Sequence, residues 1–81
     1  MYVLVTFLGL HRAQARTDHI RIPLIEKTRV IDILTHLKKL YPDLPFPEDA
    51  ILVSVNDKIS SMERILENED NVTFLPFLGG G

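Results

Sequence analysis

The sequence has no cysteine at all and little glycine, with four glycines among its 81 residues. The absence of cysteine excludes a disulfide scaffold, a cysteine–zinc site and a cysteine nucleophile. A chain in a reducing cytosol can do without disulfides, because they rarely persist there. The few glycines are unevenly placed, since three of them stand together at residues 79–81. Glycine loses more backbone entropy on ordering than any other residue, so this cluster does not serve the stability of a small domain.

The sequence also lacks an apolar run long enough to cross a bilayer. Its apolar start, residues 2–10, is far too short for a membrane span. That segment has neither the basic region nor the small-residue cleavage site of a signal peptide. We therefore expect a cytoplasmic protein without a membrane partner, in which this segment is the first strand. A length of 81 residues is that of one domain.

Neither sign of charge is in large excess, and the net charge is −2. Residues 1–40 carry seven basic and three acidic residues, a balance of +4, whereas residues 41–81 carry two and eight, a balance of −6. A solvated surface with offsetting halves explains this pattern. The alternative is a polar docking surface, with an acidic side near the C-terminal tail that steers toward a basic partner. The basic residues are scattered and not interleaved with aromatic ones, so nucleic acid is not an expected partner.

Hydrophobic periodicity predicts one helix among several strands. Residues 29–41 carry apolar side chains at helical spacing and follow Thr28, a good N-cap. Residues 19–24 alternate like a half-buried strand, and Pro23 places that strand at or near a sheet edge. The remaining expectations are strands at 2–8, 51–55 and 72–77, a brief return strand at 58–59, a helical turn at 61–67, and a polar hairpin connection at 9–18.

This order of elements predicts an α+β fold with a mixed sheet of four to five strands packed on one main helix. The first and last strands are the most uniformly apolar, so we expect them to be central neighbours. The order is that of the β-grasp, or ubiquitin-like, fold. The expected organisation is a β-grasp domain at 1–77 followed by a flexible glycine tail at 78–81.

Several short motifs occur in this framework from end to end of the chain. They are a strand ending in Phe7 before Leu10-His11-Arg12, one amphipathic helix, a Val-Asn turn at 55–56, and an acidic turn, apolar strand and proline at 69–76 before the glycines. With these motifs the chain resembles the ubiquitin-like sulfur carrier family. That family includes the small subunit of molybdopterin synthase, the thiamine-pathway sulfur carrier and related protein modifiers. The full-length helix and the proline-rich connection after it are most similar to the molybdopterin-synthase subunit.

The tail departs from the family pattern at two positions. Family members usually finish the last strand with two prolines, and here Pro76 is followed by Phe77 instead of a second proline. A third glycine, Gly79, stands where the family has a small residue. Both departures concern the branch of the family more than membership in it.

The resemblance implies a carrier protein and not an enzyme. An ATP-dependent, E1-like activating enzyme would adenylate the carboxylate of Gly81, and a persulfide sulfur would convert the adenylate to a thiocarboxylate. The sulfur would pass to the large subunit of molybdopterin synthase or to another acceptor enzyme, in molybdopterin or tungstopterin biosynthesis. The chain itself would bind no cofactor and no metal, since ATP is used by the activating enzyme.

The same resemblance assigns roles to the tail residues. Gly80 and Gly81 fit the narrowest part of the activating enzyme's channel, and Gly79 and Leu78 fit its mouth. An apolar docking patch beside the tail root is expected from residues that cannot all face the helix: Leu8, Leu52, Leu75 and Phe77. The alternative is that loops cover these residues or that they are scattered on the surface.

Other functions fit the same sequence. The tail also suits a modifier conjugated to lysines, a thiamine-pathway carrier, or a non-covalent β-grasp domain whose glycines are a truncated linker; a frayed end is a further alternative. The three histidines, His11, His19 and His36, lack metal-ligand spacing and are expected in solvated or hairpin positions. Ser60 and Ser61 have no partners for a catalytic triad.

Overall fold

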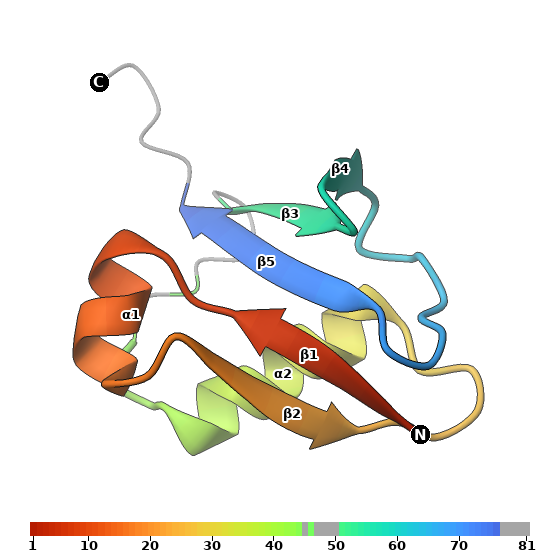
Figure 1. The fold of residues 1–81 in the computed structure, drawn as a ribbon, viewed down its shortest axis with the longest axis horizontal. Helices are drawn as coiled ribbons and strands as arrows, with labels where there is room; N and C mark the ends of the chain where they lie inside the picture. Colours follow the sequence, from red (N-terminus) through yellow and green to blue (C-terminus); the bar gives the residue numbers. More distant parts are fainter. Residues whose placement is uncertain (45, 47–50, 77–81) are drawn as a thin grey trace.

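The computed structural model describes residues 1–44, 46 and 51–76. These residues form five strands of one mixed sheet and two helices (Figure 1). In chain order the elements are β1 (Tyr2–Thr6), α1 (Gly9–Ala15), β2 (His19–Pro23), α2 (Val30–Leu40), β3 (Ile51–Val55), β4 (Lys58–Ser60) and β5 (Asn71–Pro76). The strand order is β2-β1-β5-β3-β4. The expected sheet is therefore confirmed, with β2 and its Pro23 at one edge.

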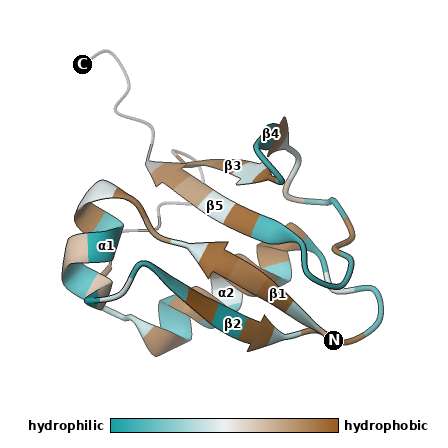
Figure 2. Cartoon of the chain, viewed as in Figure 1, coloured by the Kyte–Doolittle hydropathy of each residue, from teal (hydrophilic) through white to brown (hydrophobic). Residues whose placement is uncertain are grey.

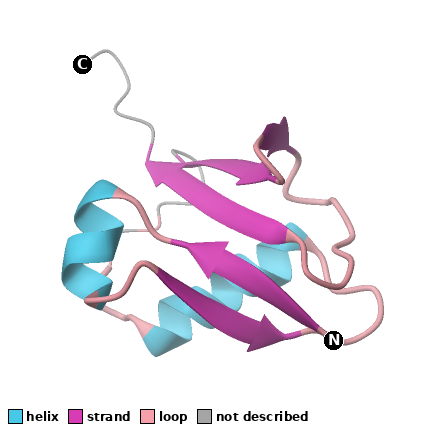
Figure 3. Ribbon diagram, viewed as in Figure 1, coloured by secondary structure: helices cyan, strands magenta, loops and turns pink. Residues whose placement is uncertain are grey.

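The first and last strands lie side by side at the centre of the sheet. They are parallel, with Val5 aligned with Val72, while β2 and β3 flank them in antiparallel fashion. Because side chains alternate along a strand, one face of all five strands is turned toward α2. Figure 2 shows the apolar character of β1 in brown, and Figure 3 shows α2 behind the sheet. The inner face and α2 bury, among others, Val3, Val5, Phe7, Val30, Leu34, Leu37, Val53, Val72 and Phe74.

The N-cap of the main helix is one residue later in the sequence than expected. Arg29, and not Thr28, is the N-cap, and its backbone N–H donates to the carboxylate of Asp32 at 2.9 Å. Thr28 is buried, and its hydroxyl donates to the carbonyl of Ile25 at 2.8 Å. The threonine therefore closes the turn before the helix. Its capping preference is satisfied by that turn and not by the helix itself.

The connection at 9–18 is not the hairpin loop that its polarity predicts. Residues Gly9–Ala15 form α1, which ends at Arg16 in the left-handed conformation. The reason is tertiary: His11 is buried and its ring packs at 4.5 Å on the ring of Phe46. One buried residue in a polar helix of seven residues, about two turns, gives no detectable stripe, so periodicity misses a helix this short.

The helical turn expected at 61–67 is also wrong. This segment is irregular, and Ile65 forms an isolated antiparallel bridge with Arg29. The N–H of Val30 donates to the carbonyl of Arg64, and the N–H of Leu66 donates to the carbonyl of Thr28. These bonds tie the segment to the start of α2, so its backbone groups are satisfied without a helix.

Within the ranges described above, no helix is long and apolar enough to cross a membrane.

Candidate functional site

The central strand β5 leads directly to the glycine end of the chain. Pro76, its last residue, is aligned with Ile51, the first residue of β3. The predicted tail residues Phe77, Leu78, Gly79, Gly80 and Gly81 lie outside the described residues. The site that the structure does describe is the root from which the tail leaves.

Two of the predicted patch residues meet at this root. Leu52 and Leu75 are aligned across the antiparallel β3–β5 pair, so both side chains are on the sheet face turned away from α2. Leu52 is 45% exposed and Leu75 is half-buried. Neither is covered by the helical layer, which lies on the opposite face (Figure 3). Together they form an open apolar surface immediately before the tail.

The third predicted patch residue, Leu8, is at the same end of the sheet. It follows the end of β1, where Thr6 is aligned with Thr73 of the parallel strand β5. Leu8 is 47% exposed and precedes the first turn of α1, whose amides donate to its carbonyl. Leu8, Leu52 and Leu75 are thus brought to one end of the molecule, and the fourth patch residue, Phe77, cannot be placed.

Sequence reasoning missed one neighbour of this surface. Ile59 of β4 is aligned with Ser54 and is 66% exposed. Because aligned residues of an antiparallel pair share a face, Ile59 extends the outward face beyond Leu52. Period-2 alternation along 51–60 contains this signal, but only the observed register shows which face Ile59 joins.

The opposite end of β5 is fixed by a network of polar side chains around the buried Asp70. Asp70 is buried and accepts hydrogen bonds from the Asn56 side-chain amide at 2.8 Å and from the Glu67 N–H at 2.7 Å. The Asn56 side-chain oxygen accepts from the N–H of Asn71 at 2.9 Å, and Thr6 donates to the Asn71 side chain at 2.9 Å. The Val-Asn turn and the acidic turn are therefore one structural unit. That unit sets the start of the strand whose other end carries the tail.

The described acidic residues of the second half do not gather at the tail root. Asp57 follows β3 beside Asn71, and Glu67 and Glu69 precede β5, so all three are at the end of β5 opposite the tail. Arg12 and Arg16, by contrast, belong to α1 and to its C-cap at the tail end. The described charges therefore give no support to an acidic side near the tail.

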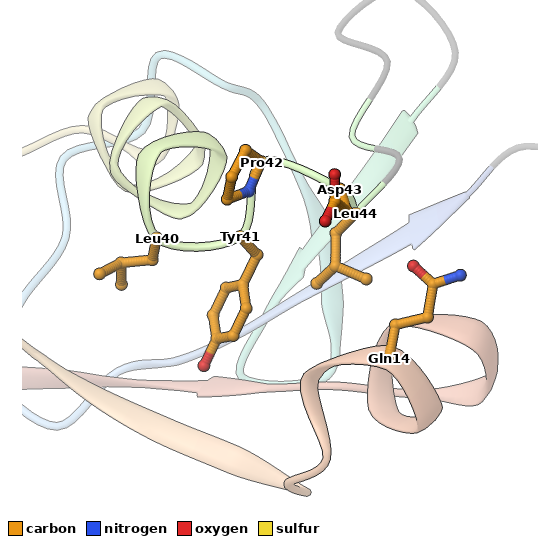
Figure 4. A pocket seen from close by; sticks show the side chains of 6 residues that line it. All are labelled: Gln14, Leu40, Tyr41, Pro42, Asp43 and Leu44. Atoms are coloured by element: carbon orange, nitrogen blue, oxygen red, sulfur yellow. The ribbon is translucent and has the colours of Figure 1, made fainter.

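The histidines and the cavities do not add a second site at this end. His19 and His36 are exposed as expected, but His11 is buried, because α1 places it against Phe46. Residues 1–44, 46 and 51–76 contain no group of three His, Asp or Glu placed to hold a metal ion. A small cavity of about 190 Å³ lies between α1 and the end of α2, with Gln14 on one side and Tyr41 and Leu44 on the other (Figure 4).

A mixed sheet with parallel central strands, one main helix across its inner face and a tail after the last central strand defines a β-grasp, ubiquitin-like protein. The matched sequence family is narrower than that class. The model of the ThiS family matches residues 5–81, which is nearly the whole chain and includes its glycines. The chain belongs to the ThiS family of ubiquitin-like sulfur carriers. Its members are small carrier proteins and not enzymes.

Solved structures agree with this assignment at the level of the fold. A protein from Pyrococcus furiosus, described as molybdopterin converting factor, subunit 1, is 27% identical, with a TM-score of 0.81 over 96% of this chain and 99% of that one. SAMP1 from Haloferax volcanii is 18% identical, with a TM-score of 0.81 and full coverage of both chains. The complex of subunits 1 and 2 of the Helicobacter pylori molybdopterin-converting factor gives 22% identity and a TM-score of 0.60, again with full coverage of both chains. No curated protein sequence matches the chain. The chain is therefore a sulfur carrier or a modifier of this kind.

Proposed function

We propose that this protein carries sulfur as a thiocarboxylate on Gly81 for molybdopterin or tungstopterin biosynthesis. The observation that supports this most is the ThiS-family match that reaches Gly81, on a chain whose central strand β5 leads to those glycines. A carboxylate is a poor electrophile until a good leaving group is attached to it. Activation therefore requires a reactive end that can reach a nucleotide site in another protein.

The proposed reaction has three steps. The Gly81 carboxylate attacks the α-phosphate of ATP, which forms an acyl-adenylate and releases pyrophosphate. The terminal sulfur of a donor persulfide attacks the acyl carbon and releases AMP, which leaves an acyl disulfide. A thiol of the donor protein then cleaves the sulfur–sulfur bond, so that the thiocarboxylate is freed and the donor is left as a disulfide. The sequence has no cysteine, so it offers no other thiol for covalent attachment of sulfur.

The body of the domain supplies recognition in this proposal. Leu8, Leu52 and Leu75 are at the tail end of the molecule, and Leu52 and Leu75 are on the sheet face that α2 leaves open. Apolar side chains that are buried in the centre of an interface dominate its binding energy. We infer that the activating enzyme and the sulfur acceptor, a large subunit of molybdopterin synthase, dock on this face in turn. The likeness to a two-subunit molybdopterin-converting factor is consistent with such a partner.

An intact-mass experiment tests the proposal. The protein is incubated with an E1-like activating enzyme of this family, ATP and a persulfide donor, and the expected product has sulfur in place of one oxygen. A variant that lacks Gly80 and Gly81, and so has no diglycine end, is the control and should stay unchanged. If the full chain acquires neither AMP nor sulfur while a known carrier of the same enzyme does, the proposal is wrong.

Conjugation to lysines is the second candidate, because an activated glycine carboxylate can acylate an amine as well as accept sulfur. The likeness to SAMP1, a protein of 18% identity, supports the fold alone and does not choose between the two. Immunoblots of cells that express the chain distinguish them. Conjugates of higher mass that disappear when Gly80 and Gly81 are deleted would favour the modifier, and their absence would favour sulfur carriage alone.

A further inference from the structure

The end of the molecule opposite the tail root has an apolar surface that the sulfur chemistry does not use. A cavity of about 400 Å³ opens there, between the start of β1, the turn from β2 to α2 and the segment before β5. Its floor contains Leu24 and Leu66, both buried. The Tyr2 N–H donates to the Asn68 side chain at 3.0 Å, which places the cavity beside the start of β1. Six residues of β5, a length of about 20 Å, separate this end from Pro76.

The rim of this cavity carries an apolar side chain that points into solvent. Ile25 is 76% exposed, the highest value among the large hydrophobic residues of the described chain. Its turn is well ordered by hydrogen bonds: the Ile25 carbonyl accepts from the Thr28 hydroxyl at 2.8 Å and from the Thr28 N–H at 3.3 Å. Thr28 itself is buried and its carbonyl accepts from Leu66 at 2.8 Å. Ile25 is therefore held beside the cavity and does not need to be ordered on binding.

The charges on the rim are of both signs. Lys27 is exposed and adopts a left-handed conformation with φ of 62°, and the acids Glu26 and Glu67 flank the same opening. A protruding apolar residue, a cavity and charges of opposite sign thus share one surface. A two-fold axis can pair such a surface with itself, because it sets the protruding residue of one copy against the cavity of the other and the base of one copy against the acids of the other.

We propose that this surface pairs with the same surface of a second copy of the chain across a two-fold axis. Ile25 of each copy enters the cavity of the other, and Lys27 of each copy faces Glu26 and Glu67 of its partner. Eight residues line the cavity, against roughly 20–30 a side in a standard interface, so the dimer is weak, with a dissociation constant on the order of 0.1 mM. The tail roots remain accessible, because they are at the far ends of the two copies. The inference does not depend on the chemistry proposed for Gly81.

Sedimentation velocity of the untagged full chain tests the dimer, from about 0.01 to about 1 mM so that the range spans the expected dissociation constant. The mass should rise from 9.3 kDa toward twice that value. Ile25→Asp should weaken dimerisation by roughly tenfold or more, because it places a charge in an apolar cavity. Ile59→Asp is the matched control, since Ile59 is 66% exposed on β4, and it should leave dimerisation unchanged.

A charge experiment provides an independent readout. Lys27→Glu gives a rim with three acidic groups, and the double variant Glu26→Lys/Glu67→Lys gives a rim with three basic groups. Each variant alone should dimerise more weakly than the parent, and an equimolar mixture should form a heterodimer more tightly than either alone. A parent chain that stays monomeric throughout the range, or a dimer that Ile25→Asp and Ile59→Asp weaken equally, would overturn the proposal.

Discussion

Leu52 and Leu75 are aligned across β3 and β5 on the sheet face that α2 does not cover, one residue before β5 ends. This pair is the part of the candidate site that the structure describes most completely. Leu52 is 45% exposed in the isolated chain, and in the proposed function it would be buried where the tail enters the activating enzyme. The relationship makes Leu52 the most informative position for separating docking from stability.

We expect Leu52→Asp to impair docking while the domain stays folded. A charge at a half-exposed position costs the free chain little, but a buried unpaired carboxylate in an apolar interface is strongly unfavourable. The KM for adenylation by the activating enzyme should rise roughly tenfold or more. Ile65→Asp is the control, because Ile65 is 56% exposed near the start of α2 and away from the tail root. Equal effects of the two substitutions would mean that the face around Leu52 is not the docking surface.

The polar network at the start of β5 should be sensitive to a change of one atom. Asp70→Asn keeps the shape of the side chain but turns one of its two acceptors into a donor. Both Asp70 oxygens accept, one from Asn56 and one from Glu67, so the amide group would face a donor. We expect a loss of about 1–3 kcal/mol in the free energy of unfolding, measured in urea. Glu67→Gln changes an exposed side chain of the same segment and should alter stability by less than about 0.5 kcal/mol.

His11 holds α1 to the rest of the domain through its contact with Phe46, whose ring lies 6.2 Å from that of Phe74 in β5. His11→Ala removes a ring from a site that is 1% exposed and leaves a cavity, so we expect a loss of about 2–4 kcal/mol in stability. Amide hydrogen exchange at residues 9–15 should become faster. His11→Phe retains a ring and should recover part of the loss, whereas Gln14→Ala, on the exposed side of α1, should change little.

The parts of the fold that were predictable are those with a repeated pattern. The stripe of α2 and the apolar runs of β1 and β5 indicate their structure without tertiary information. The central position of those strands was predicted from their largely apolar sequences. The helix α1 was not predictable, because it is held by tertiary contacts such as that of His11 with Phe46 and not by a repeated pattern. The prediction of a helical turn at 61–67 was wrong for a similar reason, since the backbone hydrogen-bond partners of this segment are at the start of α2 and in the turn before it.

The candidate site was also predictable only where a pattern within one strand indicates it. Leu52 and Leu75 were expected as members of a patch from the alternation within each strand, yet only the β3–β5 register shows that they are direct neighbours. The position of the charges was not predictable, because an excess of acidic residues in one half of the sequence does not say which end of a strand they occupy. Asp57, Glu67 and Glu69 are late in the chain but far from the tail root, because β3 and β5 are antiparallel.

The glycines themselves yield the sharpest functional prediction. If a narrow channel admits the last two residues, Gly80→Val should reduce adenylation by about a hundredfold or more, because a branched side chain on the residue before the reacting glycine blocks close approach and restricts the backbone. Gly79→Ala should cost less than about threefold, since a small side chain is accommodated at the mouth of such a channel. Both positions follow the last strand in the sequence, so we expect urea unfolding to give the parent free energy for both. Pyrophosphate release in the presence of the activating enzyme measures the first quantity. A larger loss for Gly79→Ala than for Gly80→Val would show that the constriction does not lie at the last two residues of the chain.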